Sequence, residues 1–528
     1  MRSRLVVFCG LGVAAILSAA TFRAAAETAE KPTLRVGVAD PEQVDSLDPA
    51  LAFMSLSWEL MWSTCTPPME VPSSRSGQGV VPRPAAAEAY PRVSRDGRTY
   101  TFTIRRGLRF SDGSPITAAN YARGLGRARS PAMQSGLLSS GLYLDDISSA
   151  TAEGRTLRVR LTKPNSGFVS RMTLPLACPV PLETPIDPAG VDLTIGSGPY
   201  HVASFARSQQ VVLRPNRHYR GPHPPRFSAI VVTIGGTIAS LYRDAQAGRI
   251  DVVWDSLSRD PTVSGAAIER YGIGKTQLFY RHSLSVFYYA LNTKRGLFRG
   301  NAPLRRAVNF ALDRREVLRE FFPTPTAAIR TDQLLPFDIP GFVDRDLFPL
   351  GGPNLRVARR LARGHERSRR AVLYSSVSPR ALHAAQVVAY NLKQIGLEVE
   401  IKSFALGVLQ AKLSTPGEPY DLAQGGWTAD YPDPFTFLGP LLGRGSKWNT
   451  SHLDDASVER RLRAAQRITG PARYRALGNL EQDVLRTQAP YAPFAVPTGL
   501  LFVSPRVGCV TFRFGNPMLS SLCLRSTG

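Results

Sequence analysis

The sequence predicts an α/β protein with more than one domain. Two kinds of segment follow one another along the chain. In one kind apolar and polar residues alternate, as they do in half-buried strands, and in the other the apolar residues have helical spacing. The chain has 528 residues, 43% of them apolar, which is more than a single hydrophobic core usually contains. These two observations indicate two or three domains in which helices pack on sheets.

In the first half of the chain, alternating segments predict strands at residues 33–40, 100–104, 156–161, 201–205, 209–215 and 228–234. A helix is expected at residues 56–65, and another follows the turn at residues 111–115, with Thr117 at its N-cap. A third helix begins at Ala239 and ends at Gly248, and a strand follows it.

The second half of the chain repeats this order on a larger scale. Strands are expected at residues 283–292, 371–376, 397–404 and 420–427. Long helices are expected at residues 302–322, 379–396 and 453–487. Such regular alternation of the two periods is typical of an α/β protein and not of an all-helical or an all-β one.

The first residues have the features of a secretory signal peptide. Arg2 and Arg4 precede an apolar run at residues 5–22, and three alanines at residues 24–26 suit a cleavage site. We expect residues 1–26 to be removed and the remainder to act in the periplasm or extracellular cell envelope; a retained membrane anchor is the alternative. Cys9 lies too early in the run to carry a lipid anchor.

The formal net charge of the chain is +24. A charge of this size can indicate a partner with negative charge, such as nucleic acid or an anionic surface. The arginines are scattered along the whole chain, without a lysine-rich tail or an RNA-binding motif. We therefore expect an arginine-rich solvated surface and no nucleic-acid partner. A basic protein that binds an anionic cell-surface polymer stays open as an alternative.

Motifs of the common enzyme classes are absent from the sequence. It contains no HExxH, GxSxG, phosphate loop or dinucleotide fingerprint after the signal peptide. Its histidines and cysteines lack metal-ligand spacing. We therefore expect no catalytic residue, no bound metal and no cofactor. A secreted hydrolase of the glycosidase type stays open as an alternative, because its two carboxylates can lie far apart in a sequence.

Five segments carry a resemblance to a known family, and they span nearly all of the chain after the signal peptide. Their motifs include GSGPYHVASF, QAGRIDVVW and GGWTADYPDPFTFL, and the segments are residues 95–127, 196–221, 246–254, 302–314 and 425–438. In order and spacing they resemble family 5 solute-binding proteins of ABC importers, which include dipeptide, oligopeptide and nickel binders. The resemblance implies a monomeric receptor that captures a peptide or similar small solute and delivers it to a membrane permease, without acting as an enzyme.

The resemblance also implies a two-lobed fold of the class II periplasmic-binding-protein type, with a small domain inserted in the first lobe. The first lobe is expected to comprise residues 27–78, 185–270 and 505–528. The inserted small domain is expected at residues 79–184 and the second lobe at residues 271–504. The chain would then cross between the lobes near residues 270 and 504, which would form the hinge.

The same resemblance implies residues that hold the ligand. Asp430, in TADYPDP, matches the aspartate that holds the amino terminus of the ligand in peptide-binding members. Trp427 and Tyr431 beside it would provide apolar walls that exclude water from the ion pair. Arg380 begins a predicted helix, where the resembling proteins place a basic residue that reaches the ligand carboxylate.

Other positions depart from the pattern of the oligopeptide binders. Gln424 stands where they carry an arginine, and Asn309 stands where they carry a lysine. Both changes remove positive charge, so a short peptide or another amine-bearing solute is expected in place of a longer peptide. Met54 and Ser55 lie in the segment that can pair its backbone with an extended ligand in this family.

Four cysteines follow the predicted signal peptide, and four cysteines permit three pairings. In an exported chain they are expected to form two disulfides, with four free thiols as the alternative. A Gly-Asn-Pro turn at residues 515–517 can bring Cys509 back to Cys523, so we expect these two to pair. Cys65 and Cys178 then pair by elimination. In the family layout this second bond ties together the two connections of the small domain.

Overall fold

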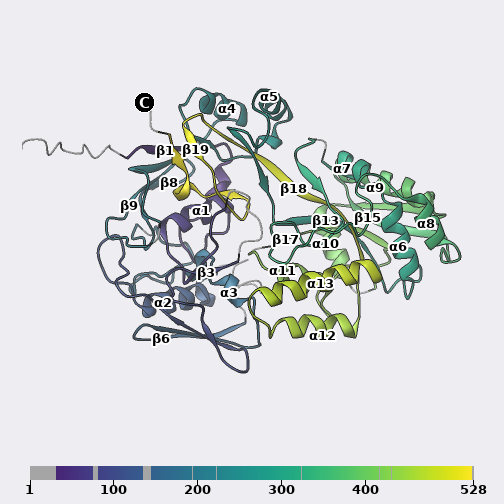
Figure 1. The fold of residues 1–528 in the computed structure, drawn as a ribbon, viewed down its shortest axis with the longest axis horizontal. Coiled ribbons are helices and arrows are strands. Elements are labelled where there is room, and N and C mark those ends of the chain that lie inside the picture. The colour runs from purple at the N-terminus through teal and green to yellow at the C-terminus, as the bar shows by residue number, and fades with distance from the viewer. Residues whose placement is uncertain are drawn as a thin grey trace, which may run out of the picture.

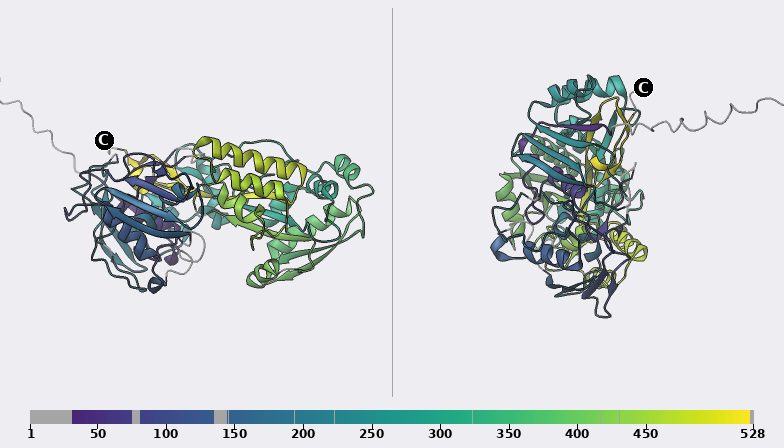
Figure 2. Two further views of the ribbon diagram at one scale, coloured as in Figure 1. Left: turned by 90° about the horizontal axis from the view of Figure 1, so that it is seen from below. Right: turned by 90° about the vertical axis from the view of Figure 1, so that its left-hand side faces the viewer.

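The computed structural model describes residues 31–525, apart from residues 75–80, 135–143, 145, 193, 222, 323, 416 and 430. The predicted signal peptide with Cys9, and the predicted ligand residue Asp430, lie outside the described residues. The described chain forms two bodies side by side along the long axis of the molecule (Figures 1 and 2). Within the described ranges, no helix combines the length and the apolar character that a membrane span requires.

A mixed sheet of twelve strands, counted over the described residues, runs through both bodies in the order β16-β15-β17-β13-β18-β11-β1-β10-β9-β8, with β12 and β14 also paired to β18. The strands are β1 (Thr33–Val38), β8 (Tyr200–Ala206), β9 (Gln210–Pro215), β10 (Ala229–Ile234), β11 (Val252–Val253), β12 (Leu278–His282), β13 (Ser285–Leu291), β14 (Ala328–Arg330), β15 (Arg370–Ser376), β16 (Glu398–Phe404), β17 (Leu422–Thr428) and β18 (Tyr491–Val503).

Strand β18 belongs to both halves of this sheet. Its first part pairs with β13 and β14, and its last residues pair with β12 and β11. We call the half with β1 and β8–β12 the first lobe and the half with β13–β17 the second lobe. The chain passes between them at Ser283 and Pro497, where the Ser283 amide donates to the Pro497 carbonyl at 3.1 Å. The two passages are therefore hydrogen-bonded to each other.

The helices cover the faces of the two halves of the sheet (Figure 1). They are α1 (Ser55–Thr64), α4 (Ile238–Gln246) and α5 (Pro261–Tyr271) in the first lobe, and α6 (Ala302–Ala311), α7 (Arg314–Phe321), α8 (Leu355–Ala362), α9 (Pro379–Lys393), α10 (Leu406–Ser414), α11 (Phe435–Leu442), α12 (Ala456–Ala465) and α13 (Pro471–Thr487) in the second. Eight of the ten residues of α1 are buried, because Leu56 and Leu60 enter the first-lobe core while Trp62 enters the core of the small domain.

The small domain has its own antiparallel sheet in the order β4-β5-β7-β6. Its elements are β4 (Arg92–Val93), β5 (Thr99–Thr103), α2 (Ala118–Ala128), β6 (Ile147–Glu153), β7 (Thr156–Leu161) and α3 (Phe168–Arg171). Thr117 caps α2 as predicted, in a capping box with Asn120. The core of this domain includes Tyr100, Phe102 and Tyr121, and it continues into the first lobe through Trp62.

Short strands complete the first lobe. They are β2 (Met69–Glu70) with β3 (Arg83–Pro84), β19 (Val507–Cys509) with β22 (Cys523–Leu524), and β20 (Phe512–Arg513) with β21 (Asn516–Pro517). The last of these hairpins turns at Phe514 and Gly515 and lies against the crossing strands, because the Arg281 side chain of β12 donates to Asn516. The final segment of the chain therefore contributes to the junction between the lobes.

The helix predicted at residues 302–322 is two helices, α6 and α7. The break lies at Leu312 and Asp313, because the Asp313 side chain accepts hydrogen bonds from the amides of Arg315 and Glu316 and so begins a new helix. The Asp313 amide in turn donates to the Asn391 side chain at 2.8 Å. A single helix through these residues was therefore a wrong prediction.

The helix predicted at residues 453–487 is also two helices, α12 and α13. Gly470 between them has a φ of +66°, which a helix does not accommodate, and Pro471 begins α13. Asp455 caps α12 through hydrogen bonds from Ser457 and Val458. The sequence contained both signals, but the apolar spacing continued across them.

Candidate functional site

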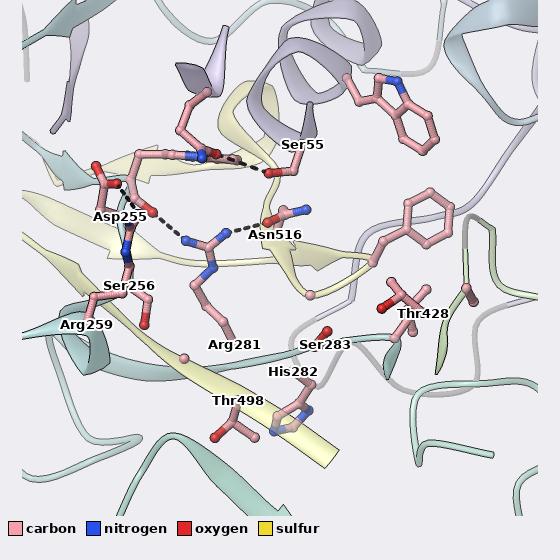
Figure 3. Close-up of a pocket in the computed structure, with 18 of the residues that line it drawn as sticks. Ser55, Asp255, Ser256, Arg259, Arg281, His282, Ser283, Thr428, Thr498 and Asn516 are labelled. Carbon is pink, nitrogen blue, oxygen red and sulfur yellow. Dashed lines mark hydrogen bonds and ion pairs between the residues drawn. The ribbon is translucent and has the colours of Figure 1, made fainter. Parts of the chain in front are cut away.

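A cavity of ≈ 480 Å³ lies between the two lobes, beside the crossing strands. Its size is in the range of cavities that hold small ligands. Residues of the first lobe line it together with Arg281, His282, Ser283 and Thr498 of the crossing strands and Thr428 and Ala429 of the second lobe. We call it the interlobe cavity, and Figure 3 shows its polar side chains.

Aromatic side chains form one wall of the interlobe cavity. Trp58 and Trp62 are one helical turn apart on α1, and their rings meet edge to face with centroids 5.9 Å apart. Phe53 packs against Trp58 at 6.4 Å, and Phe514 of the C-terminal hairpin packs against Trp62 at 5.1 Å. The Trp62 indole donates to the Thr173 carbonyl, so its polar atom is satisfied away from the cavity. The wall therefore offers apolar surface to a ligand.

Arg281 projects from β12 into the same cavity (Figure 3). Its guanidinium donates to the Trp254 carbonyl and to the Asn516 side chain, and it lies 5.0 Å from the centre of the Trp254 ring. Burial lowers the pKa of Arg281 to about 10, and the Asp255 carboxylate opposes that shift. The group therefore keeps its positive charge at neutral pH.

Asp255 and Arg259 form an ion pair in the cavity. Asp255 follows β11 and accepts a hydrogen bond from the Ala39 amide at 2.6 Å. Arg259 lies 3.3 Å from Asp255 and 3.4 Å from Asp40. Two carboxylates therefore face Arg259, and the charge of Asp255 also acts on Arg281.

The side of the cavity next to the crossing strands is polar. His282 lies 3.2 Å from Asp338, and its ring meets Phe337 edge to face. The Ser285 hydroxyl, within hydrogen-bond distance of Thr428 at 2.8 Å, links the start of β13 to the end of β17. These contacts hold the end of β17 against the crossing strands.

A second cavity of ≈ 630 Å³ lies between the small domain and the second lobe. Trp427, Tyr431 and Phe435 line it, together with the basic residues Lys163 and Arg467. The end of β17 therefore separates two cavities: Thr428 and Ala429 line the interlobe cavity, whereas Trp427 and Tyr431 line the second one.

Comparison with known families decides the class of this protein. The sequence profile described as "Bacterial extracellular solute-binding proteins, family 5 Middle" matches residues 81–449, which is more than half of the chain. The chain belongs to this family. The family and the two-lobed α/β fold predicted from the sequence are thereby confirmed.

Similar proteins cover most of this solute-binding protein. The oligopeptide-binding protein OppA of Bacillus subtilis (strain 168) is 22% identical over 430 residues, 76% of this chain and 77% of OppA. The probable deoxycholate-binding periplasmic protein YgiS of Escherichia coli (strain K12) is 24% identical over 510 residues, 91% of this chain and 89% of YgiS. The solved structure of clavulanic acid biosynthesis oligopeptide binding protein 2 is 25% identical, with 94% of this chain and 96% of that chain covered and a TM-score of 0.76.

The structure places the predicted ligand residues of the solute-binding protein in different surroundings. Asp430 lies outside the described residues, so its role stays a prediction. Trp427 and Tyr431 line the second cavity, and the Trp427 indole donates to the Thr436 carbonyl at 2.6 Å. Both aromatic residues are therefore near the end of β17 but are turned away from the interlobe cavity.

Ser55 lines the interlobe cavity, whereas Met54 does not. The Met54 amide donates to Asp45 at 3.2 Å, and its carbonyl accepts from the Trp58 amide at 3.0 Å. The Phe53 amide also donates to Asp45. The main-chain groups of Met54 are thus used within the chain, and strand-like pairing with a ligand at this residue has no support in the structure.

Gln424 and Arg380 lie away from the interlobe cavity. Gln424 is buried, and its side-chain carbonyl accepts hydrogen bonds from the Ser375 hydroxyl and the Ser376 amide, which ties β17 to β15. Arg380 is exposed in the first turn of α9. Neither residue lines this cavity, and their roles in binding stay predictions.

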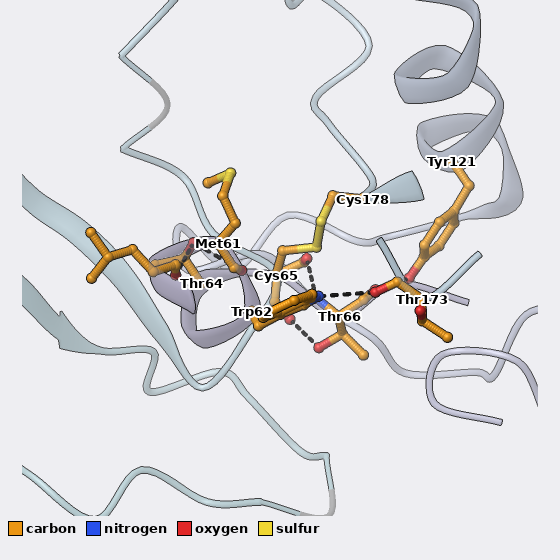
Figure 4. Close-up of a disulfide and its surroundings, with 10 residues drawn as sticks. Met61, Trp62, Thr64, Cys65, Thr66, Tyr121, Thr173 and Cys178 are labelled. Carbon is orange, nitrogen blue, oxygen red and sulfur yellow. Dashed lines mark hydrogen bonds between the residues drawn. A yellow bond between two sulfur atoms is a disulfide. The ribbon is translucent and has the colours of Figure 1, made fainter. Parts of the chain in front are cut away.

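Both predicted disulfides are confirmed. Cys65 is bonded to Cys178, with Cα atoms 5.9 Å apart, at the boundary of the first lobe and the small domain (Figure 4). Cys509 is bonded to Cys523, with Cα atoms 5.2 Å apart, across the pair β19 and β22. The described residues contain no group of histidine, cysteine and acidic side chains that could hold a metal ion.

Sequence reasoning missed most of the residues that line the interlobe cavity, among them Arg281, Asn516 and Asp255. The spacing of Trp58 and Trp62 on a predicted helix was a usable signal, because two tryptophans one turn apart form a continuous surface. Asp255 directly follows the motif QAGRIDVVW. Arg281 and Asn516 are 235 residues apart and carry no local signal.

Proposed function

We propose that this solute-binding protein captures a peptide or a similar small solute in the interlobe cavity and delivers it to the membrane permease of an ABC importer. The observation that supports this is the composition of the cavity, which takes residues from both lobes and from the strands that join them. A solute that contacts both lobes stabilises the arrangement in which they are close, and a permease can recognise that arrangement.

The ligand class follows from size and from the relatives. A cavity of ≈ 480 Å³ suits a short peptide better than a long one. OppA is named for oligopeptides and YgiS for deoxycholate, so members of this family take different solutes. In this proposal Asp430, which follows the cavity residue Ala429, holds the ligand amine, as the matching aspartate does in peptide-binding members.

The protein acts outside the cytoplasm as a monomer and performs no chemistry on its ligand. Two disulfides support an oxidising compartment such as the periplasm or the extracellular side of the envelope. The family match supports binding rather than catalysis, because it is a family of solute-binding proteins.

Native mass spectrometry of freshly purified protein tests the proposal. A small molecule should copurify at one per chain, and it should be recovered unchanged after release. Small-angle scattering of the stripped protein should then show a smaller radius of gyration when that molecule is returned. An unchanged radius at saturation, or recovery of a cleaved product, would contradict capture by closure of the lobes.

A further inference from the structure

Arg281 is the charged side chain of the interlobe cavity that has no carboxylate within ion-pair distance among the described residues. Its guanidinium donates to two neutral acceptors, the Trp254 carbonyl and the Asn516 side chain, and the Asp255 carboxylate acts on it from farther away. A guanidinium has five N–H donors, so these two bonds leave donors for a further acceptor. Figure 3 shows the group in the middle of the cavity.

The other ionisable side chains of the cavity each have an ionisable partner close by. Arg259 faces both Asp255 and Asp40, and His282 lies beside Asp338. Asp255 accepts a hydrogen bond from the Ala39 amide with one oxygen and from Arg259 with the other. A hydrogen bond between a guanidinium and a carboxylate is stronger than one to a neutral acceptor, so the remaining donors of Arg281 favour a ligand carboxylate that enters the cavity.

The two acceptors also fix the position of Arg281. Trp254 directly follows β11 and Asn516 belongs to the C-terminal hairpin, so the guanidinium is held between two segments of the first lobe. The indole ring of Trp254 lies under it at 5.0 Å. A guanidinium held in this way is ready to bind a carboxylate, because little side-chain freedom remains to be lost.

We propose that the solute bound in the interlobe cavity carries a carboxylate that pairs with Arg281 and an apolar group that packs on Trp58, Trp62 and Phe514. This rests on the proposed function. It assigns the carboxylate end to Arg281 and not to Arg380, which is exposed and outside the cavity. The ligand is then an apolar or aromatic carboxylic acid, of which a dipeptide with an aromatic side chain is one form.

Binding of four defined probes tests this proposal. The probes are the dipeptide alanyl-phenylalanine, its C-terminal amide, 3-phenylpropionate and 3-phenylpropanamide, titrated by calorimetry into the stripped wild-type protein. Each carboxylate should bind at least about tenfold more tightly than its amide, because only the carboxylate can form an ion pair. The comparison needs no variant, so it does not depend on whether a variant folds.

Two variants then assign the effect to a residue. Arg281→Gln should reduce the carboxylate-to-amide ratio to about one, while Arg380→Gln should leave it unchanged. The proposal would be overturned if the wild type bound acids and amides equally, or if neither acid bound at concentrations up to about 1 mM. It would also be overturned if Arg380→Gln lost the preference for acids over amides. If a neutral molecule copurifies and closes the lobes, the proposed function stands and this inference fails.

Discussion

Asp48 of the first lobe and Arg127 of the small domain form a bidentate ion pair that is almost completely buried. Their oxygens and nitrogens are 2.5 and 2.6 Å apart, and each side chain is 1% exposed. Asp48 also accepts hydrogen bonds from the amides of Ala50 and Val191. The pair is therefore a fixed connection between the small domain and the first lobe.

Arg127→Ala should lower the free energy of unfolding by about 3–5 kcal/mol, because it leaves the Asp48 carboxylate buried without its partner. Arg249→Ala is a matched control, since Arg249 pairs with Asp244 at the surface and should contribute at most about 1 kcal/mol. Urea unfolding followed by circular dichroism measures both. Equal losses in the two variants would show that burial does not set the strength of the Asp48 pair.

Replacing Cys65 and Cys178 together by serine should lower the free energy of unfolding by about 4–5 kcal/mol, because their bond closes a loop of 113 residues. The pair Cys509 and Cys523 closes a loop of 14 residues and should contribute about 3 kcal/mol. Urea unfolding of the two double variants gives these values. Peptide mapping without reduction should find both linked pairs, and a link between Cys65 and either C-terminal cysteine would contradict the structure.

Stability should depend on pH through Glu59 of α1. Burial raises the pKa of Glu59 from 4.5 to about 8, while the charge of Arg513 opposes the shift. Between these two values the folded protein keeps a proton that the unfolded chain has released. The free energy of unfolding should therefore fall as pH rises from about 4.5 to about 8, by about 1.4 kcal/mol per pH unit for this group.

Glu59→Gln should reduce the pH dependence of the free energy of unfolding by about 1.4 kcal/mol per pH unit, because the amide cannot ionise. The amide oxygen can still accept the hydrogen bond from the Leu519 amide. The exposed Glu269→Gln serves as the control and should leave the slope unchanged. Urea unfolding at several pH values between 5 and 8 gives the slopes. Parallel curves for the wild type and Glu59→Gln would mean that Glu59 is already ionised in the folded protein.

Asp430→Asn should weaken the binding of an amine-bearing ligand by about 2–5 kcal/mol, as removal of one partner from a desolvated charge pair does. Calorimetry with the molecule that copurifies with the protein measures the loss. The same substitution should not affect a ligand that lacks the amine. Full affinity of Asp430→Asn for an amine-bearing ligand would show that the residue matching from the resemblance is wrong.

Gly515→Ala should disturb the C-terminal hairpin. Gly515 has a φ of +75°, and a Cβ atom there would lie 1.6 Å from the His282 carbonyl oxygen. Gly445 has nearly the same φ, +73°, but no atom within 4 Å of its Cβ position. Gly445→Ala should therefore cost about 1–2 kcal/mol from backbone strain alone, and Gly515→Ala should cost clearly more in thermal or urea unfolding.

Much of the fold could be predicted because it depends on local patterns. The alternation in TYTFTI gave β5, and Thr117 marked the start of α2, as both are set by neighbouring residues. Cys509 and Cys523 could be paired for the same reason. The patterns failed where a cap overrode apolar spacing, as Asp313 does between α6 and α7.

The interlobe cavity could be predicted only in part, because it is assembled from distant segments. Family motifs led to the end of β17 and to Ser55, which do lie at or near it. They also led to Gln424, whose polar group is used to join two strands. Arg281 depends on Asn516 for its position, and no local pattern can reveal a contact between a central strand and the C-terminal hairpin.

The hydrogen bond from Ser283 to Pro497 also limits how the lobes can move. Two separate loops would let the lobes rotate in any direction, but here the two passages between the lobes form a single antiparallel ribbon. Such a ribbon bends out of its plane with little loss of hydrogen bonding, whereas sliding or splaying its strands breaks their bonds. The two lobes should thus travel along one arc, so that the same two faces meet in every cycle of capture and release.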